Sequence, residues 1–205
     1  MRFVKLFFIS LFGLGVVLFL LSLLIPPDAM VERTGVIEAP VATVYDHLGD
    51  LRHWKSWYPM LSEDSLWDLD ISDPSYGAGA SVRWTNKQDP SDTGRLTLTR
   101  VDSSAGVYYR LVARKGQLAD GGLEFKTTAD GKGTAIHWYV TSHLGYLPWW
   151  KFFGFVADRV LGPQMESALN TLRDDCEHRI RSKQALPADS VRPATPDTAA
   201  APQAI

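Results

Sequence analysis

The sequence predicts an α+β fold in which a curved antiparallel sheet wraps around a long C-terminal helix, with a further apolar helix at the N-terminus. From residue 65 onward, apolar and polar residues alternate in six short segments separated by close turns, which is typical of antiparallel strands. After residue 163 the apolar residues recur every three or four positions, as on one face of a helix. An apolar sheet face and an apolar helix stripe bury each other, so the two predict one domain.

The first element is an uncharged segment that runs from Leu6 to Ile25. A helix of this length is about 30 Å long, which matches the hydrocarbon core of a bilayer. The segment is longer than the roughly 7–15 apolar residues of a signal peptide, and residues 26–30 form a poor cleavage site. We therefore expect an uncleaved membrane anchor, with a cleaved signal peptide and a buried soluble helix as the alternatives.

The charges beside this segment predict its orientation. Arg2 and Lys5 precede it, whereas Asp28 and Glu32 follow it, so the N-terminus is expected in the cytoplasm and the soluble domain outside. In a bacterium this means a single-pass protein of the inner (plasma) membrane with a periplasmic domain. The expected divisions are 1–5 cytoplasmic N-terminus, 6–25 transmembrane anchor, 26–30 linker, 31–184 ligand-binding domain and 185–205 disordered tail rich in alanine and proline.

Composition excludes some classes of function. The formal net charge is -2, so there is no basic surface for nucleic acid. A single cysteine, Cys176, cannot form an internal disulfide. Because Cys176 falls in a helical apolar stripe, we interpret it as a small core residue rather than a reactive thiol.

The soluble part begins with a strand over 31–38 that stops at Pro40. A helix is then expected from Val41, with Gly49 and Asp50 marking a break, and a second short helical stretch carries Trp54 and Trp57. Six strands follow, and residues 130–133 predict a hairpin turn before the last of them. The residues expected to face inward on these strands include Trp67, Leu69, Ile71, Val82, Trp84, Leu96, Leu98, Val107, Tyr109, Leu111, Leu123, Phe125, Ile136 and Trp138.

The C-terminal region is expected to be helical, with proline marking an interruption. Gly162 and Pro163 should break the helix, because proline lacks the amide hydrogen and clashes with the preceding turn. The apolar stripe that follows consists of Met165, Leu169, Leu172, Cys176 and Ile180. Where the curved sheet stands away from this helix, a cavity is expected to form.

Between Val31 and Ile180 the chain resembles the helix-grip, START-like superfamily (SRPBCC), which includes the plant pollen-allergen fold and the polyketide cyclase/dehydrase families. The resemblance is carried, in order, by Val36-Ile37-Glu38-Ala39-Pro40, Val44-Tyr45-Asp46-His47-Leu48, Asp50-Leu51-Arg52-His53-Trp54, Trp57-Tyr58-Pro59, Gly133-Thr134-Ala135-Ile136-His137-Trp138, Gly162-Pro163, Met165-Glu166 and Leu169. It implies a β-α-α-β6-α fold with an interior cavity; the membrane anchor is an addition. The superfamily includes lipid carriers, hormone receptors, cyclases and modules without a known ligand, so the fold alone does not fix the activity.

Two aromatic groups are the candidate binding residues. The first should line an apolar pocket between sheet and helix, although each member can also be ordinary core. The second combines aromatic residues with Lys151 and is expected either at the membrane interface or as a lid over the cavity. The first group is Trp54, Trp57, Trp84, Tyr109, Phe125 and Trp138; the second is Trp149, Trp150, Phe152 and Phe153, with Tyr146 and Phe155 beside them.

Catalytic and metal-binding patterns are weak. Asp46, His47, Asp50 and His53 share a broad helical face, but without paired metal-ligand spacing they are best interpreted as a solvated face or a helix cap. No Gly-x-Ser-x-Gly motif is present, and Gly77 to Val82 is interpreted as a turn between strands. We therefore expect no metal or cofactor and assign no catalytic residue. The histidines His137 and His143 are expected on the outer face of the sheet.

The leading hypothesis is a membrane-anchored START-like domain that binds a lipid or another hydrophobic small molecule in its interior. Its partners would be that molecule and the lipid bilayer. One alternative is an enzyme of the cyclase/dehydrase kind acting on an apolar ketone, for which Tyr109 is the inward polar candidate. The other alternative is a ligand-free module of the cell envelope that binds a protein through its surface.

Overall fold

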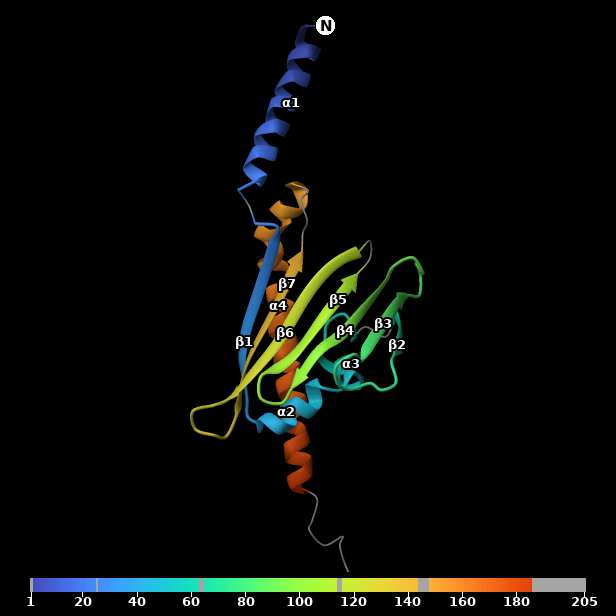
Figure 1. Cartoon of the computed structure of the whole chain (residues 1–205), viewed down its shortest axis with the longest axis vertical. Helices are drawn as coiled ribbons and strands as arrows, with labels where there is room; N and C mark the ends of the chain where they lie inside the picture. Colours follow the sequence, from blue (N-terminus) through green and yellow to red (C-terminus); the bar gives the residue numbers. More distant parts are fainter. Residues whose placement is uncertain (1, 25, 63–64, 114–115, 144–147, 186–205) are drawn as a thin grey trace, which may run out of the picture.

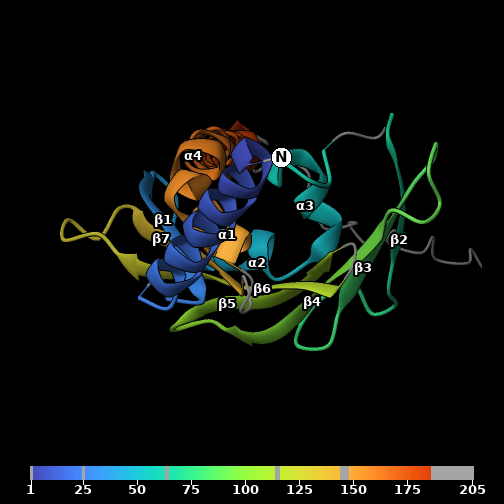
Figure 2. The same ribbon diagram turned by 90° about the horizontal axis from the view of Figure 1, so that it is seen from above.

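An antiparallel sheet curves around the helices that lie on its concave face (Figures 1 and 2). This computed structural model describes residues 2–24, 26–62, 65–113, 116–143 and 148–185, without the side chains of 2, 148–155 and 183–185. The elements are α1 (Arg2–Ser22), β1 (Asp28–Ile37), α2 (Val41–Leu48), η1 (Leu51–His53), α3 (Trp54–Trp57), β2 (Trp67–Ile71), β3 (Ser81–Asn86), β4 (Thr93–Asp102), β5 (Gly106–Ala113), β6 (Gln117–Thr127), β7 (Thr134–His143) and α4 (Pro148–Ala185).

The predicted fold class is confirmed. In the described chain the sheet has seven strands in the order β1-β7-β6-β5-β4-β3-β2, and every neighbouring pair is antiparallel. The six strands expected after residue 65 are β2 to β7, and the hairpin at Gly131 (φ 72°) joins β6 to β7. The alternation of apolar and polar residues also predicts correctly which side chains face the inside of the domain, since Val82, Leu98, Leu123 and Ile136 are buried.

The helices cover the concave face in two groups. Figure 2 shows α4 above β1 and β7, with α2 and α3 over the strands beyond them. The predicted stripe of α4 is confirmed, because Met165, Leu169, Leu172 and Cys176 are buried against the sheet and the short helices. Burial raises the pKa of the Cys176 thiol to about 12, so Cys176 is an unreactive core residue, as expected.

The predicted break at Pro163 is wrong, because α4 continues through it from Pro148 to Ala185. The guanidinium of Arg33 on β1 lies over Gly162, where a Cβ atom would overlap it. It donates to Asp158 Oδ1 (2.8 Å) and to Glu166 Oε1 (2.7 Å), one carboxylate on each side of Gly162. These ion pairs hold the two halves of α4 together across the one backbone hydrogen bond that proline cannot donate.

The N-terminal segment is a helix, as predicted, but its bounds differ slightly. Helix α1 ends at Ser22 rather than at Ile25, and its side chains from Phe3 to Leu21 are exposed. By length and composition, Phe3–Ser22 can cross a membrane, a test that a signal sequence also passes. Strand β1 begins at Asp28, so part of the expected linker is strand. The expected tail over 185–205 lies almost entirely outside the described residues.

Candidate functional site

Four of the six predicted aromatic residues meet a fifth, Tyr58, between the sheet and the short helices. Tyr109 lies on β5 and Trp138 on β7, and all five side chains are at most 6% exposed. Ring centroids are 4.9 Å apart for Trp54 and Trp57, 5.4 Å for Trp54 and Tyr109, and 5.7 Å for Trp57 and Trp138. We call Trp54, Trp57, Tyr58, Tyr109 and Trp138 the aromatic cluster.

Sequence reasoning left Tyr58 out of the candidate site. Tyr58 follows Trp57 directly and lies four residues after Trp54, so helical spacing places Tyr58 beside Trp54. Their ring centroids are 5.2 Å apart, and Tyr58 also contacts Tyr109 and Trp138 at 6.0 and 5.9 Å. This spacing was the pattern that could have identified it.

The other two predicted residues are buried but do not belong to the aromatic cluster. Trp84 on β3 packs on the backbone of Gly94, where a Cβ atom would lie 2.2 Å from its ring. Phe125 on β6 packs edge-on against Tyr45 of α2, with ring centroids 6.4 Å apart. Both have the surroundings of ordinary core residues.

Polar atoms inside the aromatic cluster are linked in a chain. Trp138 Nε1 donates to the Tyr109 hydroxyl at 2.9 Å, and the Tyr109 hydroxyl shares a hydrogen bond with Tyr58. An indole N–H and two hydroxyls supply three donors for these two hydrogen bonds. One of the two hydroxyl hydrogens is therefore not used within this chain of hydrogen bonds.

One donor of the aromatic cluster has no partner in the described part of the chain, the indole N–H of Trp57. Its Nε1 atom is buried and has no hydrogen-bond partner among the described residues. In contrast, the indole N–H of Trp54 donates to the Leu48 carbonyl at 2.8 Å. A buried donor without a partner costs about 1–3 kcal/mol, so such groups in native proteins call for an explanation such as a ligand or water.

Both tyrosines of the aromatic cluster keep their protons at neutral pH. Burial raises the pKa of Tyr58 to about 12, partly offset by its hydrogen bond with Tyr109. Burial, the neighbouring Tyr58 and the hydrogen bonds between them leave the pKa of Tyr109 well above its usual value. The aromatic cluster therefore consists of neutral rings that can donate hydrogen bonds but cannot act as bases near pH 7.

The expected solvated face around His47 is wrong for His47 itself. His47 is 2% exposed, its ring stacks on that of His53 with centroids 4.8 Å apart, and Asp175 of α4 lies 3.7 Å from its Nε2 atom. Neither ring nitrogen of His47 has a hydrogen-bond partner among the described residues. Burial, helped by Arg179 and His53 and opposed by Asp175, lowers the pKa of His47 to about 4.

The helix-cap interpretation is confirmed for Asp50. Its Oδ1 atom accepts from the Arg52 backbone N–H at 3.0 Å at the start of η1, and its carboxylate pairs with the Arg52 guanidinium. Burial favours the neutral acid, but the hydrogen bonds from Arg52 outweigh it and lower the pKa of Asp50 to about 2. Within the described residues no group of three or more His, Cys, Asp or Glu side chains is arranged to hold a metal ion.

The apolar pocket was expected at the first aromatic group, but neither of two hollows beside β1 is lined by any of its six residues. One of about 190 Å³ lies between β1 and α4, and one of about 480 Å³ extends over the outer face across β1, β7 and β6. His137 borders the second hollow, and His143 lies 36% exposed on the same face, which confirms the outward orientation expected for both.

The second aromatic group lies at the start of α4. Figure 1 places this end of α4 beside the end of α1, and the two helices are in contact. The side chains of Trp149, Trp150, Phe152 and Phe153 lie outside the described residues, so this position rests on the backbone alone. Further along the same helix, Val156 and Val160 are 43% and 48% exposed.

Comparison with known proteins decides the family. The protein-family model described as polyketide cyclase / dehydrase and lipid transport matches residues 28–177, which is more than half of the chain. The chain belongs to this family. The match begins at the first residue of β1 and ends on α4, so α1 lies outside it. Among curated proteins, none matches the chain.

Solved structures agree with this family at the level of the fold. The chain is similar to the Zhui aromatase/cyclase from Streptomyces sp. R1128 (TM-score 0.52, 18% identity, covering 76% of this chain and 98% of that one). It is also similar to Ara h 8.0201 (TM-score 0.51, 14% identity, 74% and 99%). Of DynU16 from the dynemicin biosynthetic locus it covers only 48%, at a TM-score of 0.49.

Proposed function

We propose that this family member is a membrane-anchored domain that binds a hydrophobic small molecule or lipid bearing an oxygen acceptor, with the aromatic cluster as its site. The observation that carries the proposal is the buried Trp57 N–H, which has no hydrogen-bond partner among the described residues. A carbonyl or hydroxyl oxygen of a ligand would accept a hydrogen bond from this N–H. Burial of apolar ligand area, at about 25 cal/mol per Å², would supply most of the affinity.

Because the five rings of the aromatic cluster contact one another, a ligand has to displace some of them to reach the Trp57 N–H. Helix α3 is a single turn of four residues, and it carries Trp54 and Trp57, with Tyr58 directly after it. It packs against α4, on which Asp175 Oδ2 accepts a hydrogen bond from Ser56 Oγ at 2.5 Å. On this proposal, α3 moves away when the ligand binds, and the ligand takes the place of its rings.

Binding is favoured over catalysis by the chemistry of the aromatic cluster. Neutral tyrosine hydroxyls can polarise a ketone, as a cyclase requires, but such an enzyme also needs a group that takes a proton. With their raised pKa values, Tyr58 and Tyr109 cannot do so near pH 7. A hydrogen-bonded, unreacted ligand fits these groups better.

A matched pair of probes tests the proposed acceptor. We expect 1-phenyl-1-dodecanone to bind about tenfold more tightly than phenyldodecane, because one net hydrogen bond contributes about 1–1.5 kcal/mol. In the Trp57→Phe variant this preference should fall to about twofold or less. Quenching of tryptophan fluorescence in the full-length protein in detergent measures both affinities. Equal binding of the two probes by the unmodified protein would contradict the proposal.

Trp54→Phe is the control for loss of ring volume. Trp54 and Trp57 are both buried on α3, but within the described part of the chain only the Trp54 N–H has an acceptor. Trp54→Phe should therefore lose about 1–3 kcal/mol more of the free energy of unfolding than Trp57→Phe, since it leaves the Leu48 carbonyl unpaired. Urea titrations measure the difference. A larger loss for Trp57→Phe would mean that its N–H has an acceptor in the ligand-free protein.

We infer further that α1 is an uncleaved anchor with its N-terminus in the cytoplasm, and that the start of α4 meets the lipid. The position of that end of α4 beside α1 supports this, as do the aromatic residues there, which favour the membrane interface. A lid over the aromatic cluster is the alternative role for Trp149, Trp150, Phe152 and Phe153.

Replacing Trp149 and Trp150 together by serine separates these roles. In a chain beginning at residue 26, the double variant should lose most of its sedimentation with liposomes, because two indole rings no longer enter the interface. Tyr76→Ser, which removes an aromatic ring that is 67% exposed elsewhere, should sediment like the unmodified chain. If liposome binding is absent in every form, or unchanged by the double substitution, the interfacial role is wrong.

A further inference from the structure

Strand β1 offers a free edge of the sheet. Among the strands that the structure describes, it pairs only with β7, and its register runs without a bulge from Asp28 to Ile37. Figure 1 shows β1 along one side of the sheet, with α4 behind it. Natural edge strands are usually protected by charges, prolines or bulges, yet Thr34 to Ile37 carries none of these. An added strand can therefore pair with this stretch.

The two hollows flank this same stretch on its opposite faces. Thr34, Gly35 and Val36 line both of them. On the α4 side, the missing side chain of Gly35 leaves room, since its Cβ would lie 3.8 Å from Leu169 Cδ1. Successive side chains of a strand point to opposite faces. A strand added beside Gly35 would thus direct alternate side chains toward one hollow and then the other.

If α1 is an anchor as proposed above, neither lipid headgroups nor a second copy of this chain can bind the free edge of β1. Thr34 lies six residues along β1 from Asp28, about 20 Å farther from the anchor, and so beyond the reach of lipid headgroups. Two copies in one membrane are related by an axis along its normal, which leaves their β1 strands parallel. Rotation about this axis without a shift along it places each backbone N–H of one β1 opposite the same N–H of the other. The two β1 strands therefore cannot form backbone hydrogen bonds with each other.

The chain's own C-terminus is a poor occupant on chemical grounds. Residues 186–205 contain Pro187, Pro193, Pro196 and Pro202, and proline cannot donate to a strand ladder. Their charged side chains are two aspartates and one arginine, so the segment is slightly acidic.

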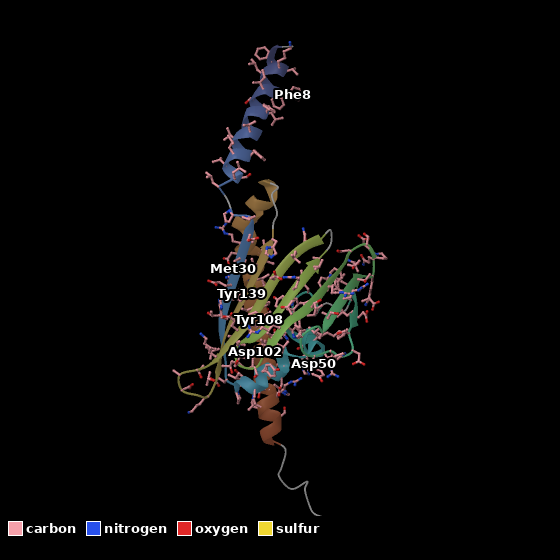
Figure 3. All side chains as sticks on the ribbon, in the orientation of Figure 1. Phe8, Met30, Asp50, Asp102, Tyr108 and Tyr139 are labelled. Atoms are coloured by element: carbon pink, nitrogen blue, oxygen red, sulfur yellow. The ribbon has the colours of Figure 1, made fainter. Side chains whose placement is uncertain are left out.

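The hollows themselves are balanced in charge, with Glu166 and Arg173 in one and Glu124 and Lys126 in the other, but carboxylates outnumber cations on and beside β1. Arg33 forms ion pairs with both Asp158 and Glu166. The Glu177 carboxylate accepts a hydrogen bond from the Glu38 backbone N–H at 3.2 Å. Figure 3 shows the outer face on which the larger hollow lies, with Met30 and Tyr139 on β1 and β7. The carboxylates on and beside β1 are Glu32, Glu38, Glu124, Asp158, Glu166 and Glu177, against the cations Arg33, Lys126 and Arg173.

We propose that the Thr34–Ile37 edge of β1 binds an extended segment of a partner protein, which adds as a strand and carries small apolar residues flanked by lysine or arginine. Backbone hydrogen bonds supply the pairing, the hollow beside Gly35 selects an apolar side chain, and the acidic rim selects the flanking cations. This site is separate from the aromatic cluster.

A peptide library tests the proposal on the full-length protein in lipid nanodiscs. Phage-displayed random dodecapeptides are selected on the unmodified protein, and the best is synthesised for fluorescence anisotropy. We expect enrichment of lysine and arginine around a short apolar run, and at least tenfold weaker binding to Gly35→Leu, which fills the hollow. Glu38→Gln should weaken binding about threefold, while Asp46→Asn on the exposed side of α2 should leave it unchanged.

Hydrogen exchange locates the contact and identifies other occupants. The bound peptide should slow exchange of the Thr34 to Ile37 amides. The proposal is overturned if no selected peptide discriminates against Gly35→Leu, or if the slowed amides lie elsewhere. It is also overturned if these amides exchange slowly before any peptide is added, and exchange faster once 186–205 are deleted or once each nanodisc holds a single copy. Gly35→Leu should bind the phenyl ketone normally, so failure here is distinguishable from failure of the proposed function.

Discussion

Alanine at position 121 is expected to lower the free energy of unfolding by about 3 kcal/mol and to abolish binding of the phenyl ketone. A Cβ atom there would lie 2.2 Å from Tyr109 Cζ and 2.4 Å from its hydroxyl oxygen. The ring has no room to retreat, because Trp54 and Tyr58 pack against it. Its displacement also breaks the hydrogen bond from Trp138. Urea titration followed by tryptophan fluorescence measures the loss.

Gly35→Ala is the matched control within the same sheet. Neither glycine has a positive φ, so the two substitutions differ in the space available for the new methyl group. At Gly35 the nearest atom lies 3.8 Å away, and the free energy of unfolding should be unchanged or raised by up to about 1 kcal/mol. A double variant, Gly121→Ala with Tyr109→Leu, should recover part of the stability. Equal stability of Gly121→Ala and Gly35→Ala would contradict this packing of Tyr109.

Acidification is expected to destabilise the protein through His47. Its pKa falls from about 6.5 when unfolded to about 4 when folded, so the folded state binds fewer protons between these values. The free energy of unfolding is unaffected by His47 above pH 6.5 and falls by about 3 kcal/mol as the pH drops to 4. Urea titrations at pH 7, 5.5 and 4 measure this change. The pKa of His143 is raised by its hydrogen bonds to Asp28 and Asp120. Its contribution to the free energy of unfolding is therefore present at low pH and is lost as the pH rises.

His47→Leu isolates this contribution. The ring nitrogens have no partners among the described residues, so the variant should be at least as stable as the unmodified protein at pH 7. Its advantage should grow by about 3 kcal/mol between pH 7 and pH 4. If the two proteins lose stability in parallel over this range, then His47 does not titrate as its burial predicts.

Much of the fold could be predicted from the sequence because the two periodicities are clear. Period-two alternation placed Val82, Leu123 and Ile136 inward on their strands, and three-to-four spacing placed Leu172 and Cys176 on the buried side of α4. These patterns depend on local geometry alone, so a single sequence contains them. The family resemblance was carried by motifs on the same elements, and the family match over 28–177 supports it.

Contacts between distant elements could not be predicted in this way. His47 was expected on a solvated face because it shares a helical face with Asp46, Asp50 and His53, but Asp175 of α4, far along the chain, lies beside it. Pro163 was expected to break the helix, since nothing near it in sequence indicates the brace from Arg33. The aromatic residues were correctly placed inside, yet their alternation cannot show that Trp84 and Phe125 lie apart from the aromatic cluster.

Native mass spectrometry of the detergent-purified, full-length protein tests the central claim most directly. We expect the 22.8 kDa chain with one hydrophobic, oxygen-bearing molecule of discrete mass, which solvent extraction recovers and which Trp57→Phe and Gly121→Ala largely lose. The contradictory result is a bare chain in every preparation, or a bound molecule that both variants retain as well as the unmodified protein does.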